Sequence, residues 1–210
     1  YLGYNEGIQE LYIGKNDLDD VCLIELFVLL NPTINKCSLR ILCIEDILKN
    51  RFTIDIAYEV SKVLKINKNL EKISFARCNI NDEVLTYMLK AIGSNDVLKV
   101  IDITANQISY KGCFVIAEFL KSPYCGLQSL ILPYNGIGDL GAQILARALR
   151  INESLVHLDL GHNGIKENGI LYLSTIFEKN TILISLKLFW NDFGINGKDE
   201  FFKLINIPNS

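Results

Sequence analysis

Leucines and isoleucines recur along this chain in a fixed pattern of apolar and polar positions. In the segment from Leu127 to Ile137, apolar residues stand at the first, fourth, sixth and eleventh places, with variable residues between them. The alternation around the fourth to sixth places predicts a short strand with one buried face. Apolar residues then follow at helical spacing, as in Ile144, Leu145 and Leu149, and predict a helix.

The same unit occurs seven times, at intervals of 28 to 31 residues, and reads L-x-x-L-x-L-x-x-N/C-x-L. We number positions within each unit from its first apolar residue. The units start near Ile8, Leu39, Leu70, Leu98, Leu127, Leu155 and Leu183. One unit cannot bury its apolar face alone, whereas stacked units form a continuous core. The sequence therefore predicts one α/β solenoid domain over residues 1–210, curved, with parallel strands on a concave face and helices on a convex face.

Position 9 of the unit predicts a structural ladder. Its members are Asn16, Cys78, Asn106, Asn135, Asn163 and Asn191. An asparagine side chain carries donor and acceptor groups, so in a buried turn it can bond the backbone of neighbouring turns. Cys78 is a smaller thiol variant. The second unit has Ile47 at this position, and we expect its turn to be looser or satisfied in another way.

A second set of asparagines stands three residues before a new unit. It comprises Asn5, Asn67, Asn95, Asn152 and Asn180. We expect these residues to end the helices, since asparagine tolerates the left-handed conformation. Asn5 is in phase with this set and the chain does not begin with Met. We therefore expect the chain to be a piece of a longer protein.

The amino-acid composition and net charge limit the classes of partner that the chain can bind. Half of the residues are apolar, 21% are charged, and the formal net charge is −3, which is typical of a folded chain. A weak negative charge argues against a general nucleic-acid binder or a polybasic membrane module. No apolar run reaches about 18 residues. We predict a cytoplasmic protein with no nucleic-acid or membrane partner, whose six cysteines are reduced and mostly buried.

The motifs that carry catalytic chemistry are absent. The sequence contains no phosphate-binding loop, no G-x-S-x-G, no H-E-x-x-H and no G-x-G-x-x-G. His157, Asp159 and His162 lie close together in the sixth unit, but chance explains them better than a metal site. We predict no enzymatic activity, no cofactor and no metal.

The repeat resembles the leucine-rich repeats of the ribonuclease-inhibitor class, from Ile8 to about Ile205. That class includes ribonuclease inhibitors, the sensor arms of NOD-like receptors, the Ran GTPase-activating protein and axonemal scaffold subunits. The resemblance implies an intracellular horseshoe that binds proteins. It leaves the partner open, because a fold does not specify a function.

The variable positions of the strands indicate where a partner could bind. At position 2, Arg40, Glu71 and Lys99 alternate in sign and predict a lateral ion-pair ladder. The last three units carry aromatic residues, which often dominate interfaces. Our candidate partner-binding residues are Ile131, Tyr134, Asp159, His162, Lys187, Phe189 and Trp190. Cover by another segment of the protein and incidental exposure are the alternatives.

The favoured function is a non-enzymatic scaffold or adaptor that holds a protein partner on the concave face. The alternative is a regulator of an enzyme. One form is a GTPase activator similar to the Ran activator, for which Arg40 and Arg77 are the candidate inserted arginines. The other form is a ribonuclease-inhibitor-like inhibitor, which the lack of a strongly acidic concave face disfavours. Exposed edges at the first and last strands also leave an edge-mediated homo-oligomer open.

Overall fold

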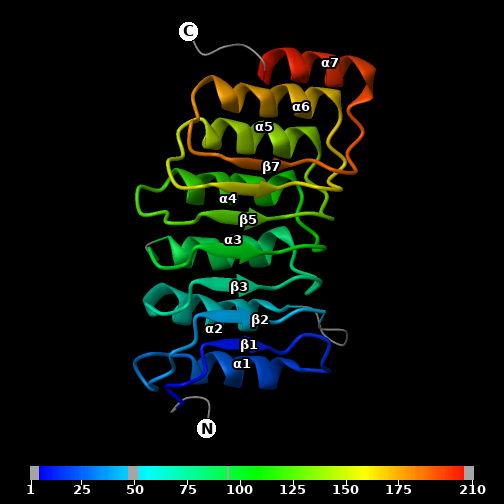
Figure 1. Cartoon of the computed structure of the whole chain (residues 1–210). Coiled ribbons are helices and arrows are strands. Elements are labelled where there is room, and N and C mark those ends of the chain that lie inside the picture. Colours follow the sequence, from blue (N-terminus) through cyan, green and yellow to red (C-terminus); the bar gives the residue numbers. More distant parts are fainter. Residues whose placement is uncertain (1–4, 47–51, 94, 206–210) are drawn as a thin grey trace.

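Short strands alternate with helices along the chain. The computed structural model describes residues 5–46, 52–93 and 95–205. The strands are β1 (Glu10–Tyr12), β2 (Ile41–Cys43), β3 (Lys72–Ser74), β4 (Val100–Asp102), β5 (Ser129–Ile131), β6 (His157–Asp159) and β7 (Ser185–Lys187). The helices are α1 (Asp20–Leu29), α2 (Ile54–Ile66), α3 (Asp82–Ile92), α4 (Tyr110–Lys121), α5 (Gly138–Leu149), α6 (Glu167–Ser174) and α7 (Gly194–Ile205), with a 3₁₀ helix at Thr175–Glu178. Figure 1 shows the units stacked in chain order, with the strands in one layer and the helices in another.

The seven strands form one parallel sheet in chain order. Residues at the same position of consecutive units lie opposite each other, as Leu42 does with Ile73 and Leu130 does with Leu158. Each strand covers positions 3 to 5 of its unit. The variation in unit length is therefore absorbed outside the strands, in helices of 8 to 13 residues and in the loops. The predicted α/β repeat solenoid is confirmed.

Apolar side chains fill the space between the sheet and the helices. Leu42, Ile73 and Leu130 are 0%, 1% and 3% exposed. Each fully buried side chain of this kind contributes about 1.5 to 3 kcal/mol to folding. In the last unit, Leu186 and Leu188 are only half-buried, since no further unit lies beyond β7 in the part of the chain that is described. The stack thus has a closed interior and an apolar end.

Position 8 is the corner at which each strand turns away from the sheet. Its residues all adopt the left-handed conformation, with φ between 51° and 58°. They are Lys15, Asp46, Arg77, Ala105, Tyr134, His162 and Trp190. This conformation costs a residue other than glycine about 1 to 2 kcal/mol. A bond to the next unit offsets the cost: the N–H of Tyr134, for example, donates to the carbonyl of Gly161 at 2.9 Å.

The position 9 side chains bond neighbouring turns. The Oδ1 atom of Asn106 accepts from the N–H of Ile80 at 2.9 Å, and its Nδ2 atom donates to the carbonyl of Phe75 at 2.9 Å. The Cys78 thiol lies 3.2 Å from the carbonyl of Ile44, as a weak donor. Ile47, the second-unit member of this row, lies outside the described residues.

One member of the ladder has an unmet acceptor. The Nδ2 atom of Asn163 donates to the carbonyls of Leu132 and Gly161, but its buried Oδ1 atom has no hydrogen-bond partner in the described structure. In Asn106, Asn135 and Asn191 this oxygen accepts from the N–H at position 11 of the preceding unit. Here that residue is Ile137, whose φ of −64° and ψ of −45° are already helical. Because α5 begins early, the ladder lacks the hydrogen bond from the Ile137 N–H to the Asn163 Oδ1 atom.

The second set of asparagines forms another ladder, which corrects the expected left-handed helix ends. Asn67 follows α2 with φ −70° and ψ 128°, and none of the set has a positive φ. The Oδ1 atom of Asn95 instead accepts from the N–H of Leu98 at 2.8 Å, and its Nδ2 atom donates to the carbonyl of Asn67 at 3.2 Å. Asn67, Asn95, Asn152 and Asn180 each join their unit to the one before it at the C-terminal ends of the helices.

Close contact between helix starts explains the glycines at position 15. The Asp82 carboxylate at the start of α3 accepts from the N–H groups of Ser109 and Gly112 at 2.8 and 2.9 Å. A Cβ atom on Gly112 would lie 2.5 Å from that same carboxylate oxygen. Only glycine allows the acid of one unit to bond the first turn of the next helix.

Candidate functional site

We call the exposed side of the sheet the strand face and the outer side of the helix layer the helix face. Side chains at positions 3 and 5 lie on the strand face, because position 4 between them points into the core. Position 3, which the sequence prediction left out, supplies a complete row. Its members are Glu10, Ile41, Lys72, Val100, Ser129, His157 and Ser185. The alternation around the buried position 4 is the signal that would have identified it.

Four aromatic side chains gather on the strand face of the last three units. We call Tyr134, His162, Phe189 and Trp190 the aromatic cluster. The Tyr134 and His162 rings stack, with their centroids 4.5 Å apart and their planes 21° from parallel. Phe189 covers Gly161 so closely that a Cβ atom there would lie 2.4 Å from the ring. Trp190 is 79% exposed, so the cluster is open to a partner.

The predicted residues at position 5 form a row beside this cluster. Ile131 lies opposite Asp159 in the sheet, and Asp159 lies opposite Lys187. The Asp159 carboxylate accepts from the N–H of Gly161 at 3.0 Å, whereas the Lys187 Nζ atom stands 3.9 Å away. This ion pair is exposed on the lysine side and contributes at most about 1 kcal/mol. The structure therefore places all seven candidate residues in the last three units of one face.

The charged row of the first units is shorter than predicted. Arg40 donates two hydrogen bonds of 2.9 Å to the Glu71 carboxylate. This contact lowers the pKa of Glu71 and raises the pKa of Arg40. The Lys99 Nζ atom donates to the carbonyl of Asp96 at 2.7 Å, so the expected direct extension of the ladder to Lys99 is wrong. Arg77, the other candidate arginine, is exposed at position 8 beside a small hollow of about 260 Å³.

A larger hollow of about 1060 Å³ opens at the end of the stack. Leu183, Leu186, Leu188 and Phe193 line it together with Phe201 of α7. These are the residues that would pack against a further unit, since among the described residues β7 pairs with β6 alone. The hollow belongs to the end of the solenoid and borders the aromatic cluster, because Phe189 also lines it.

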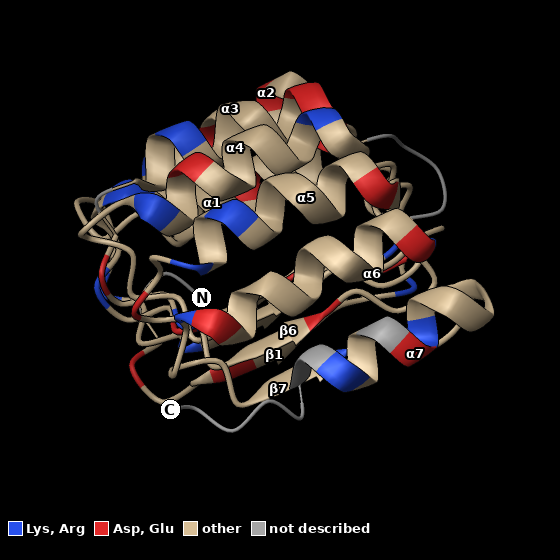
Figure 2. Ribbon diagram, turned by 90° about the horizontal axis from the view of Figure 1, so that it is seen from above, with Lys and Arg blue, Asp and Glu red and all other residues tan. Residues whose placement is uncertain are grey.

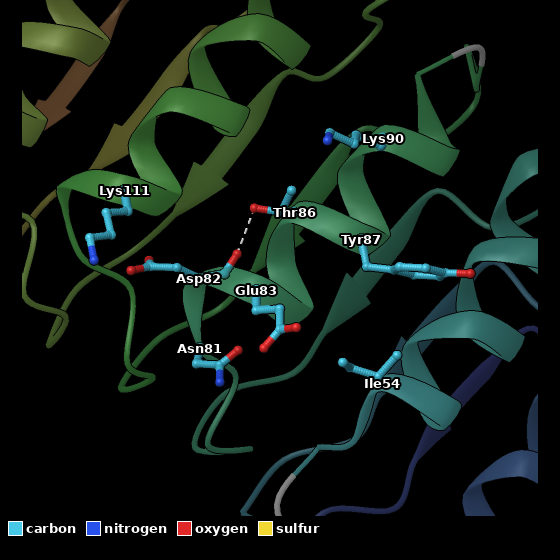
Figure 3. Close-up of a pocket in the computed structure, with 8 residues that line it drawn as sticks. All are labelled: Ile54, Asn81, Asp82, Glu83, Thr86, Tyr87, Lys90 and Lys111. Carbon is cyan, nitrogen blue, oxygen red and sulfur yellow. Dashed lines mark hydrogen bonds between the residues drawn. The ribbon is translucent and has the colours of Figure 1, made fainter.

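A hollow of about 600 Å³ on the helix face carries both acidic and basic side chains (Figure 3). Asp82 and Glu83 come from the first turn of α3, and Lys111 comes from the first turn of α4. The Thr86 hydroxyl donates to the backbone carbonyl of Asp82, as the dashed line in Figure 3 shows. Asp82 bonds the next helix, and the residues lining this hollow include no serine, cysteine or histidine nucleophile.

In residues 5–46, 52–93 and 95–205, the side chains form neither a metal site nor a catalytic thiol site. No three His, Cys, Asp or Glu side chains converge there on a point where a metal ion would fit. All six cysteines carry reduced thiols, and four of them are buried. Burial raises the pKa of Cys113 to about 12. Cys22 is exposed and Cys125 is partly buried, so the cysteines are mostly buried, as predicted. No helix in the described part of the chain is long and apolar enough to span a bilayer.

Charge is mixed across the molecule. Figure 2 shows acidic and basic segments interspersed along the helix layer rather than gathered into one face of a single sign.

These features define a class: a solenoid of strand–helix repeats with side-chain ladders at both ends of each unit and an accessible sheet. A family model described as "Leucine Rich repeat" matches residues 126–146 and 152–174, within the fifth and sixth units. The chain is a leucine-rich repeat protein.

Relatives of known sequence carry the same repeats. The chain is 33% identical to NACHT, LRR and PYD domains-containing protein 14 of Mus musculus over 107 residues, which cover 51% of this chain and 11% of that protein. It is 28% identical to NACHT, LRR and PYD domains-containing protein 9C of Mus musculus over 165 residues, covering 78% of this chain and 16% of that protein. The chain thus spans only 10% to 16% of the length of the curated relatives that it matches.

Two solved structures share the fold. The first is the leiomodin-1 actin-binding site 2, with a TM-score of 0.57 and 22% identity over 70% of this chain and 86% of that chain. The second is the tropomodulin C-terminal domain of Caenorhabditis elegans, with a TM-score of 0.51 and 13% identity over 90% of this chain and 92% of that chain. At these identities the likeness concerns the fold alone. The unit length of 28 to 31 residues and the α-helix in each unit are consistent with the ribonuclease-inhibitor-like subclass.

Proposed function

We propose that this chain is a non-enzymatic interaction module, a scaffold or adaptor that binds a protein partner on its strand face in the cytoplasm. The aromatic cluster is the observation that carries the proposal. Exposed apolar and aromatic side chains gathered on one surface are typical of contact sites, and tryptophan and tyrosine are enriched among residues that dominate binding energy. Trp190, which is 79% exposed, would lie at the centre of the contact.

The geometry of the cluster favours binding at a low entropic cost. Tyr134 is held by the stacked ring of His162, and Phe189 is held against Gly161. Side chains that are ordered before binding lose less freedom on association. Asp159 and Lys187 would form a polar rim beside the apolar side chain of Ile131, and this rim would set the register of the partner more than its affinity.

The enzyme-regulator alternative is less well supported. An arginine that enters a partner's active site needs a free guanidinium, and Arg40 is bound twice to Glu71. Arg77 is the remaining candidate, and its exposure alone does not distinguish it from an ordinary surface residue. A homo-oligomer through the exposed edges of β1 and β7 is a further proposal, which concentration-dependent light scattering would test.

A capture experiment with matched variants tests the strand-face proposal. The bait is wild-type protein beside the double variants Tyr134→Ala/Trp190→Ala and Phe114→Ala/Tyr172→Ala. The second pair removes aromatic side chains that are 56% and 41% exposed on the helix face. We expect one partner to bind the wild type and the helix-face variant but not the strand-face variant. Equal capture by all three baits would contradict the proposal.

The single tryptophan supplies a direct readout with the purified partner. Because Trp190 is 79% exposed, acrylamide quenches its fluorescence efficiently in the free protein. Binding on the strand face should bury the indole, shift its emission to the blue and reduce quenching. A partner that binds with no change in either property contacts another surface, and the proposal would then fail for that partner.

A further inference from the structure

A groove on the helix face runs between α2 and α3, far along the chain from the aromatic cluster. Two hollows of about 600 and 360 Å³ make up the groove, and both are lined by Tyr87 and Lys90. Figure 3 shows Tyr87 reaching from α3 toward the helix that carries Ile54. Small side chains at Ser61 and Ala91 line the second hollow and leave space between the helices. The groove can therefore accept side chains from outside.

The charge of the side chains that line the groove changes along its length. Glu83 lies at the end where the two helices begin, and Lys65 and Lys90 lie in their last turns. Tyr58 and Tyr87 stand between them, 49% and 41% exposed, with ring centroids 6.4 Å apart. Glu83 and Lys90 are two turns apart on α3, which is about 10 Å along the helix axis. Lys111 of α4 also lines the hollow at the end with Glu83, so an aromatic centre is flanked by one acid and one base at that end and by two bases at the other.

The flanking charges are available to a partner. Lys62 is already engaged, because its Nζ atom lies 2.9 Å from the Glu59 carboxylate and 4.9 Å over the ring of a groove tyrosine. Within the described part of the chain, Glu83, Lys65 and Lys90 form no hydrogen bond or ion pair with another side chain. Neither tyrosine hydroxyl in the groove has a partner among the described residues either. These groups can exchange water for a ligand without breaking an internal contact.

We propose that this groove binds an amphipathic α-helix of a partner protein, lying antiparallel to α2 and α3. Its apolar stripe would cover Tyr58 and Tyr87, acidic residues in its first turn would meet Lys65 and Lys90, and basic residues in its last turn would meet Glu83. The orientation follows from the charges, since helices favour acidic residues at the start and basic residues at the end. An apolar stripe laid into a groove is a common mode of helix recognition.

The probe is a fluorescein-labelled synthetic helix of about 12 residues, whose first and last turns lie about 12 Å apart, with glutamates in its first turn, a leucine stripe at helical spacing and lysines in its last turn. A second peptide of the same composition exchanges the charged ends. Fluorescence anisotropy measures both against the whole chain at low ionic strength. We expect the first peptide to bind about tenfold more tightly, because two or three exposed charge pairs change sign between them. Equal affinities, or no binding of the first peptide at millimolar protein, would overturn the proposal.

Variants locate the site and separate this proposal from the strand-face one. Lys90→Glu should weaken the first peptide and strengthen the second, and Tyr87→Ala should weaken both. Arg147→Glu, in the last turn of α5, is the matched control and should leave both affinities unchanged. The variant Tyr134→Ala/Trp190→Ala should bind like the wild type. Loss of peptide binding in that variant with retention in Lys90→Glu would refute the groove and leave the strand face as the site.

Discussion

Replacing Asn106 by alanine tests the side-chain ladder at the middle of the stack. The Asn106 side chain accepts from the N–H groups of Cys78 and Ile80 and donates to the carbonyls of Phe75 and Thr104, which makes four bonds. Each bond contributes about 0.5 to 1.5 kcal/mol net. Asn106→Ala should therefore lower the free energy of unfolding by about 2 to 6 kcal/mol, out of a total of about 5 to 15 kcal/mol.

Urea unfolding followed by circular dichroism at 222 nm measures this loss. With a slope of about 2 kcal/mol per molar urea, a loss of about 4 kcal/mol moves the midpoint by about 2 M. Asn106→Cys should lose less, because a thiol can still donate weakly, as Cys78 does to the carbonyl of Ile44 at 3.2 Å. The control is Gln107→Ala, which removes one exposed bond of 3.4 Å to Asn79.

The reasoning has a clear refutation. If Asn106→Ala costs less than about 1 kcal/mol, like the control, then water satisfies the freed backbone groups and the ladder contributes little to stability. A split transition would support the reasoning in another form. Units of a solenoid interact only with their neighbours, so a weakened fourth unit can uncouple the two halves of the stack. Near-ultraviolet and far-ultraviolet signals recorded together would reveal such a split.

Three further predictions concern other parts of the structure. Gly112→Ala should destabilise the protein by about 1 to 3 kcal/mol, because its Cβ atom would lie 2.5 Å from a carboxylate oxygen, whereas Gly136→Ala, with its nearest contact at 3.6 Å, should change stability little in the same urea assay. Arg40→Gln should lower the melting temperature at pH 7 and low salt. Because Arg40 lowers the pKa of Glu71, the stability that this ion pair contributes is present above the ordinary glutamate pKa of about 4.3. It is lost as pH falls through the lowered pKa of Glu71. Melting temperatures of the wild type and Arg40→Gln that stay apart below that pH would contradict this. Asp19 raises the pKa of the exposed Cys22 of α1, so iodoacetamide should label Cys22 slowly, and faster at pH 9 than at pH 8. Cys113, whose pKa is about 12, should be spared until the protein is unfolded, as read by mass spectrometry.

The repeat pattern alone determined the fold class and the neighbours of each strand residue. A parallel stack with one strand per unit places equal positions side by side, so Leu130 opposite Leu158 follows from counting. For the same reason the pattern predicted that Tyr134 and His162 are lateral neighbours. These neighbours can be predicted without knowing how the helices pack, because every unit buries the same positions of the repeat.

Only the tertiary structure decided how individual side chains use their surroundings. Lys99 bonds the backbone of its own loop instead of Glu71, because a flexible side chain takes whichever acceptor lies nearest. Asn67 and Asn95 join successive units instead of ending helices in the left-handed conformation. The missing rung at Asn163 depends on how early α5 begins. Each outcome depends on distances between units that no spacing along the chain specifies.

Of the two proposed surfaces, one could be predicted from the sequence and the other required the tertiary structure. The strand-face cluster could be predicted because its members share positions in successive units. The groove between α2 and α3 could not, since Tyr58, Tyr87 and Lys90 occupy different positions of their units and meet only through the packing of two helices. Period and composition describe what each unit must bury. The angle and distance at which helices pack determine what the outer surface leaves open, and these depend on side-chain volumes summed over the whole stack.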